Sequence, residues 1–98
     1  MFDISTVNKR YFQIKLDDIT LNVEPPKVKT LKKIASLSRA KGEEAMGELS
    51  EAVRTLLNKN TSGYVVPDEI IDELDYDQLN EIIERYFDWL SNEKNGKN

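Results

Sequence analysis

The sequence contains no cysteine and no histidine. Without cysteine there are no disulfides, no thiolate nucleophiles and no cysteine-bound metal sites. Without histidine the chain lacks the commonest general base at neutral pH and the commonest transition-metal ligand. The four glycines, Gly42, Gly47, Gly63 and Gly96, are scattered and form no phosphate-binding loop. These absences predict a protein with no catalytic residues, no cofactor and no metal site.

Long apolar runs are missing as well. No stretch approaches the roughly 18 residues of a membrane-spanning helix. The segment Met1–Ser5 has neither the basic region nor the apolar run of a signal peptide. The chain of 98 residues is 39% hydrophobic and 33% charged, which is typical of one globular domain. We therefore expect a single domain, residues 1–98, that is cytoplasmic and makes no membrane contact.

Alternating polarity predicts a β-hairpin at about residues 10–23. A two-residue turn at Asp17 and Asp18 places every apolar residue of both strands on one face, so pattern and register agree. These residues are Phe12, Ile14, Leu16, Ile19, Leu21 and Val23. A lone hairpin is marginally stable in water, so we expect this face to pack on helices.

Apolar residues at helical spacing follow from about residue 27 to residue 91. The first predicted helix, after Pro25 and Pro26, turns Val28, Leu31, Ile34, Ala35 and Leu37 inward. The second follows Glu43 and Glu44, and its inward residues are Ala45, Met46, Leu49, Ala52, Val53, Leu56 and Leu57. Residues 58–63 form a polar break after it.

Two further helices complete the predicted fold. A short third helix has Pro67 at its first position. The fourth begins at a capping box formed by Asp75 and Gln78, and residues 92–98 are expected to be a disordered tail. The fold class is therefore α+β and predominantly α, with an N-terminal β-hairpin followed by about four helices.

The net charge of −4 conceals an uneven distribution. The stretch 27–41 contains only basic charged residues, namely Lys27, Lys29, Lys32, Lys33, Arg39 and Lys41. Residues 68–88 contain one base, Arg85, among the acids Asp68, Glu69, Asp72, Glu73, Asp75, Asp77, Glu81, Glu84 and Asp88. Two solvated helix faces are the plainer interpretation, and whether the two stretches pair with each other stays open.

The alternative interpretation is a small nucleic-acid-binding regulator that uses the basic helix 27–41 to neutralise phosphates. The acidic isoelectric point, about 4.8, speaks against it. So does the lack of interleaved aromatic or base-reading side chains on that helix. Nucleic acid is therefore not the expected partner.

Aromatic residues crowd the end of the last helix. Successive helical residues turn by about 100°, so Tyr86, Phe87 and Trp89 cannot be buried equally, and Phe87 fits the core best. Trp and Tyr often anchor protein interfaces. The predicted partner-binding residues are Tyr64, Tyr86, Trp89 and Leu90. For Tyr64 and Trp89, completion of the core remains the alternative role.

Three segments together carry a resemblance to a known family. They are the hairpin 11–19, the basic helix after Pro25 and Pro26, and the C-terminal run 65–74 with its closing aromatic stretch 86–90. Their order resembles the tail assembly chaperones of long-tailed bacteriophages and prophages of Gram-positive bacteria. That family usually has a glycine in the hairpin turn, where this chain has Asp17 and Asp18.

The resemblance implies a non-enzymatic assembly factor. Such chaperones coat the tape-measure protein, help recruit tail-tube subunits and often self-associate as homo-oligomers. They act in the cytoplasm of the bacterial host and are absent from the mature virion, and a longer form made by frameshifting is common. A small acidic domain with amphipathic helices suits this role, because it can cover apolar helical segments of a partner while its charge opposes aggregation.

Overall fold

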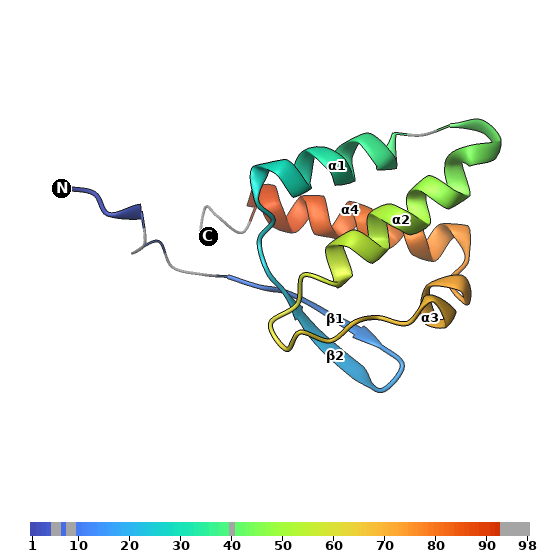
Figure 1. The fold of residues 1–98 in the computed structure, drawn as a ribbon, viewed down its shortest axis with the longest axis horizontal. Coiled ribbons are helices and arrows are strands. Elements are labelled where there is room, and N and C mark those ends of the chain that lie inside the picture. Colours follow the sequence, from blue (N-terminus) through green and yellow to red (C-terminus); the bar gives the residue numbers. More distant parts are fainter. Residues whose placement is uncertain (5–6, 8–9, 40, 93–98) are drawn as a thin grey trace.

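The computed structural model describes residues 1–4, 7, 10–39 and 41–92. The chain forms β1 (Phe12–Leu16), β2 (Ile19–Val23), α1 (Val28–Ser38), a short 3-10 helix η2 (Gly42–Glu44), α2 (Ala45–Leu57), α3 (Asp68–Asp72) and α4 (Tyr76–Asn92). The predicted α+β class, a hairpin followed by four α-helices, is confirmed. In Figure 1, α2 and α4 lie between the hairpin and α1.

The hairpin has the predicted register. Phe12 pairs with Val23, Ile14 with Leu21 and Leu16 with Ile19. The turn residue Asp17 takes a positive φ of 51°, a conformation that glycine and asparagine adopt more readily than aspartate. The apolar face of the hairpin packs on the helices, as expected for a two-stranded sheet.

Helix α2 is the centre of the core. It packs against α1, α3, α4 and β2, and its inward residues Leu49, Ala52, Val53, Leu56 and Leu57 are all buried. Because α1 packs mainly on this one neighbour, only a narrow stripe of it is covered, and Ile34 is its single buried residue. The predicted inward positions of Val28 and Met46 are wrong, since these side chains are 70% and 41% exposed at the starts of their helices.

The start of α4 confirms the predicted capping box. The Asp75 N–H donates to Gln78 Oε1 at 2.9 Å, and the Gln78 N–H donates to Asp75 Oδ1 at 2.8 Å. Helix α3 begins at Asp68, so Pro67 precedes it as the N-cap residue rather than occupying its first position. Helix α4 continues through Asn92, one residue into the expected tail, and residues 93–98 lie outside the described residues.

The predicted polar break is an ordered loop built around buried Asn60. Its Nδ2 donates to the carbonyl oxygens of Leu57 and Tyr64 at 2.9 and 2.8 Å. Its Oδ1 accepts hydrogen bonds from the Tyr64 N–H and the Ser62 hydroxyl, both at 2.9 Å. All four bonding positions of this amide are thus used. The loop lies beside β2, where Asn60 forms a bridge with Val23.

Candidate partner-binding groove

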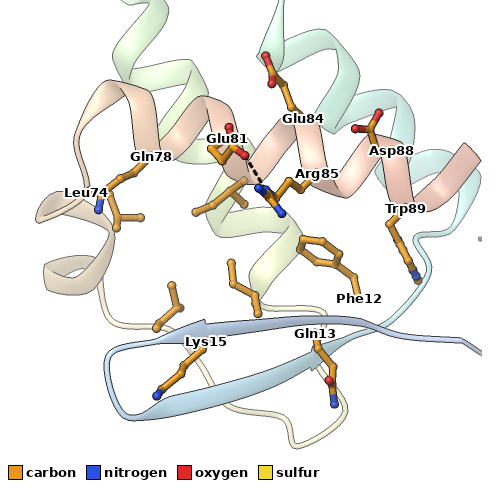
Figure 2. A pocket seen from close by; sticks show the side chains of 13 residues that line it. Phe12, Gln13, Lys15, Leu74, Gln78, Glu81, Glu84, Arg85, Asp88 and Trp89 are labelled. Atoms are coloured by element: carbon orange, nitrogen blue, oxygen red, sulfur yellow. Dashed lines mark hydrogen bonds and ion pairs between the residues drawn. The ribbon is translucent and has the colours of Figure 1, made fainter. Parts of the chain in front are cut away.

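An open groove of about 880 Å³ separates β1 from α4 (Figure 2). Its apolar lining comes from β1, from α4 and from Leu74, which lies between α3 and α4. These residues are Phe12, Ile14, Leu16, Leu74, Ile82 and Trp89. Polar and charged residues Gln13, Lys15, Gln78, Glu81, Glu84, Arg85 and Asp88 complete the wall. An apolar floor with a charged border is the usual form of a protein or peptide docking groove.

The whole of β1 borders the groove. All five of its residues line the cavity, although successive side chains of a strand point to opposite faces. In Figure 2 the side chains of Gln13 and Lys15 point away from α4. The groove therefore runs along the outer edge of β1, and no residue of β2 lines it.

The α4 side of the groove is acidic. Glu81, Glu84 and Asp88 present carboxylates there, and all three residues are exposed. The single cation of this helix, Arg85, is hydrogen-bonded through Nε to Glu81, which raises the pKa of the guanidinium. Glu84 and Asp88 make no ion pair with another of the described residues. This wall can therefore attract a basic segment of a partner.

Aromatic rings close one end of the groove. The Phe12 ring lies edge-on to Tyr86 with centroids 5.7 Å apart, and its centroid is 5.8 Å from that of Trp89. Arg10 also contacts the indole, with its guanidinium carbon 4.6 Å from the Trp89 ring centroid. These contacts hold Trp89 in a fixed position at the border of the groove.

Arg10 also binds the last turn of α4. Its Nη1 donates to the Trp89 carbonyl oxygen at 2.7 Å and its Nη2 to the Leu90 carbonyl oxygen at 2.9 Å. Carbonyl groups at the end of a helix lack intrahelical partners and carry partial negative charge, so a guanidinium suits them. Nothing in the sequence pointed to this role of Arg10, because one arginine ahead of a strand carries no periodic signal.

The predicted partner-binding residues have different positions. Tyr86 is 1% exposed in the core, and burial raises the pKa of its phenol. It therefore offers no surface to a partner, and the prediction that Tyr86 binds one is wrong. Trp89 is 9% exposed but lines the groove. Tyr64 and Leu90 are half-buried against the core, and their role in binding stays a prediction. Phe87 is also half-buried, so Tyr86 takes the core position expected for it.

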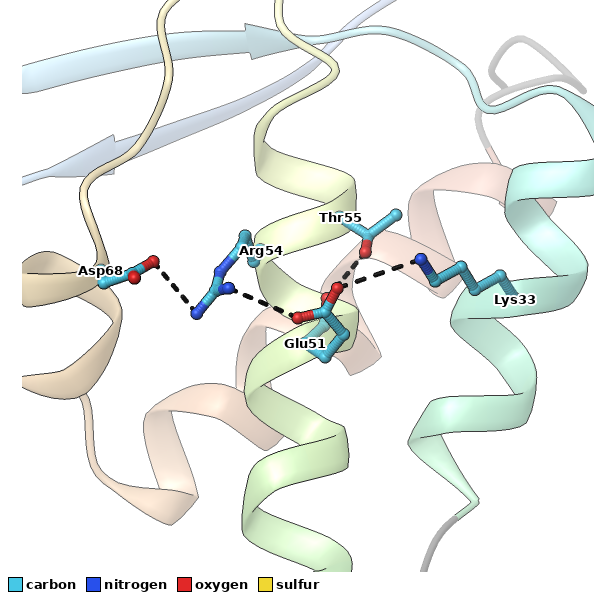
Figure 3. A network of polar contacts seen from close by, with 5 residues as sticks. All are labelled: Lys33, Glu51, Arg54, Thr55 and Asp68. Carbon is cyan, nitrogen blue, oxygen red and sulfur yellow. Dashed lines mark hydrogen bonds and ion pairs between the residues drawn. The ribbon is translucent and has the colours of Figure 1, made fainter.

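The basic and acidic stretches are joined through α2 (Figure 3). Lys33 Nζ on α1 lies 3.9 Å from Glu51 Oε2, Arg54 Nη1 lies 3.5 Å from Glu51 Oε1, and Arg54 Nη2 lies 3.1 Å from Asp68 Oδ1 on α3. Within the described part of the chain, no ion pair joins α1 directly to α3 or α4. Such exposed pairs contribute little to stability. The α1 residues Lys29, Lys32 and Lys33 are all exposed to solvent.

In the described ranges, no three histidine, cysteine, aspartate or glutamate side chains cluster in a way that could hold a metal ion. Within the same ranges, no helix has the length and apolar character needed to cross a membrane.

Comparison with known proteins gave no match: no family model, no curated protein and no solved structure is similar to this chain.

Proposed function

We propose that this chain is a non-catalytic phage tail assembly chaperone that binds a tape-measure protein in the groove between β1 and α4. The observation that carries the proposal is an apolar floor beside an acidic wall. An amphipathic segment of the partner buries its apolar face against Ile14 and Ile82. It places lysine or arginine side chains near Glu84 and Asp88.

The net charge of −4 also supports this role, because a charged, compact protein that covers an apolar segment keeps the complex soluble. On this proposal the complex forms in the bacterial cytoplasm, recruits tail-tube subunits and is discarded before the virion matures. The order of the hairpin and the helices supports the same assignment through the family resemblance.

The test is co-expression with the tape-measure protein of the same phage or prophage. We expect the tape-measure protein to stay soluble and to co-purify with this chain. The double variant Glu84→Lys/Asp88→Lys should weaken capture about tenfold, because it reverses the charge of the α4 wall. A tape-measure protein that remains insoluble or elutes alone would contradict the proposal.

The matched control is Asp72→Lys/Glu73→Lys. These exposed residues at the end of α3 do not line the groove, and the change in net charge is the same. Capture by the control should equal capture by the unaltered protein. If both double variants weaken capture equally, general charge attraction rather than the groove accounts for the binding.

A further inference from the structure

The outer edge of β1 presents the backbone groups of Gln13 and Lys15. On the opposite edge of the hairpin, the Asn22 carbonyl accepts from the Thr61 N–H at 3.0 Å, so the Asn22 backbone points away from β1. In an antiparallel pair both residues of such a position point outward, and Gln13 is the partner of Asn22. Backbone direction repeats at every second residue of a strand, so Lys15 points outward as well.

No described residue pairs with these groups from outside the hairpin. The sheet has two strands, and among the described residues no backbone hydrogen bond reaches Gln13 or Lys15 from another element. Both residues are exposed. A free edge of this kind accepts a further strand unless something covers it. Since the groove follows the same edge, an added strand would also have space for its side chains.

The free edge favours an extended occupant of the groove over a helical one. A helix uses its backbone N–H and C=O groups internally, so it could not pair with those of Gln13 and Lys15 and would bury them unpaired. Burial of an unpaired polar group costs free energy. An extended segment pairs with these groups through its own backbone, while its alternate side chains enter the groove.

The two ends of the groove differ in chemistry. Phe12 marks one end, where its ring centroid lies 5.8 Å from that of Trp89. The neighbouring Asp88 is exposed and makes no ion pair with another of the described residues. In Figure 2, Leu74 lies at the opposite end of the groove. A side chain that enters the groove is therefore best accommodated if it is basic near Asp88 and apolar near Leu74.

We infer that an extended segment of a partner protein adds as a third strand to the outer edge of β1. Its groove-facing residues are basic near Asp88 and apolar near Leu74, and they alternate with uncharged polar residues. Those alternate residues share the face of Lys15, where a further positive charge would be repelled. The inference rests on the proposed function for the position of the binding site, and it adds the conformation and the residue pattern of the segment that binds.

The probes are two synthetic peptides of about ten residues, the length of a long strand. In each peptide, threonine occupies every second position and alternates with lysine in one half and with valine in the other. The two peptides differ in the order of these halves, because parallel and antiparallel strands run in opposite directions along β1. At least one peptide should bind. Binding by neither would overturn the inference.

Amide hydrogen exchange, followed by NMR on the unaltered protein, measures the backbone pairing directly. In the free protein the amides of Gln13 and Lys15 should exchange rapidly. A saturating peptide should slow both about tenfold or more, because they become bonded to the added strand. The amide of Thr20, which lies opposite Lys15 and points outward from β2, should keep its exchange rate.

Two results of the exchange measurement would overturn the inference. If a peptide binds and both amides stay fast, it occupies the groove without pairing, as a helix would. If both amides are already slow in the free protein, another part of the chain or a second copy covers the edge.

The variant Gln13→Pro removes one outward N–H from this edge. Proline is tolerated on an edge strand where the missing N–H faces solvent, so we expect the hairpin to form. Peptide affinity should fall about tenfold, because a hydrogen bond to the added strand is lost and its acceptor stays unpaired. Unchanged affinity in the folded variant would contradict the inference.

The matched control is Thr20→Pro. It removes an outward N–H from β2, which does not line the groove, and like Gln13→Pro it leaves the net charge unchanged. This control should bind the peptide as the unaltered protein does. Far-UV circular dichroism measures whether both variants fold, and the exchange experiment needs neither of them.

The inference and the proposed function can fail separately. If a peptide pairs with β1 and the tape-measure protein does not co-purify, the proposed function fails and the inference holds. If Gln13→Pro captures the tape-measure protein as well as the unaltered protein does, the inference fails and the proposed function holds.

Discussion

Arg10 joins the segment before β1 to the last turn of α4 through two hydrogen bonds and a stacked indole ring. We predict that Arg10→Ala lowers the free energy of unfolding by about 2 kcal/mol, because two charge-assisted bonds and a cation–π contact are lost together. Arg10→Lys should recover little, since an ammonium cannot donate the same parallel pair. Urea denaturation measures both. Arg39→Lys, on the exposed end of α1, is the control and should leave stability unchanged.

The buried phenol of Tyr86 makes stability depend on pH in alkaline solution. Burial raises its pKa above the ordinary value of about 10, so the folded state keeps the neutral form. The contribution of the buried neutral phenol to the free energy of unfolding is fully present below pH 10. It is lost as the pH rises above that value, by up to about 1.4 kcal/mol per pH unit. We predict that the free energy of unfolding falls less for Tyr86→Phe than for the unaltered protein between pH 9 and pH 11. Parallel urea titrations of the two proteins measure this difference. Equal losses would contradict the prediction.

At the scale of elements, Gly47 occupies a place in α2 that needs no glycine. A Cβ added there meets nothing within 4 Å, and its φ is not in the left-handed region. We predict that Gly47→Ala stabilises the protein by about 0.5–1 kcal/mol through helix propensity. Gly42→Ala is the contrasting variant. Its φ of +81° strains any L side chain, so the same replacement should destabilise. Thermal denaturation of the two variants should show shifts of opposite sign.

Local signals predicted the elements well, because their causes lie within a few residues. The hairpin register follows from two-residue alternation around a two-residue turn, and the capping box follows from Asp75 and Gln78 at the required spacing. Both were correct in detail. The predicted start of α3 was one residue too early, and the predicted end of α4 was one residue too short. Helix ends are hard to predict because they depend on weak terminal bonds.

The groove could not be predicted from the sequence, because it depends on how β1 and α4 lie relative to each other. For the same reason the burial of Tyr86 and Phe87 was assigned in the wrong order. Both fit the apolar stripe of α4, and the ring of Phe12, more than 70 positions earlier in the chain, packs against Tyr86. The periodicity of α1 also predicted that Val28 points inward, but this side chain is 70% exposed.

At the scale of the whole molecule, the buried apolar residues form one cluster that includes β1, β2 and all four α-helices. We predict cooperative unfolding in a single transition. Trp89 is the one tryptophan of the sequence and lies where Arg10 and β1 meet α4, so its fluorescence reports on that junction. Far-UV circular dichroism reports mainly on the helices. The two urea curves should coincide, and an earlier fluorescence change would show that the hairpin separates from α4 first.

Helix α2 packs against α1, α3 and α4, and its Glu51 and Arg54 pair with Lys33 of α1 and Asp68 of α3. Lys29, Lys32 and Arg39 are exposed on α1 or directly after it, and Glu81, Glu84 and Asp88 are exposed on α4. A molecule whose charges of opposite sign lie on different helices has an electric dipole moment, and the field of a charged partner exerts a torque on it before contact. A basic partner segment therefore meets the chain with α4 already turned toward it, and this pre-orientation weakens as added salt shortens the range of the field.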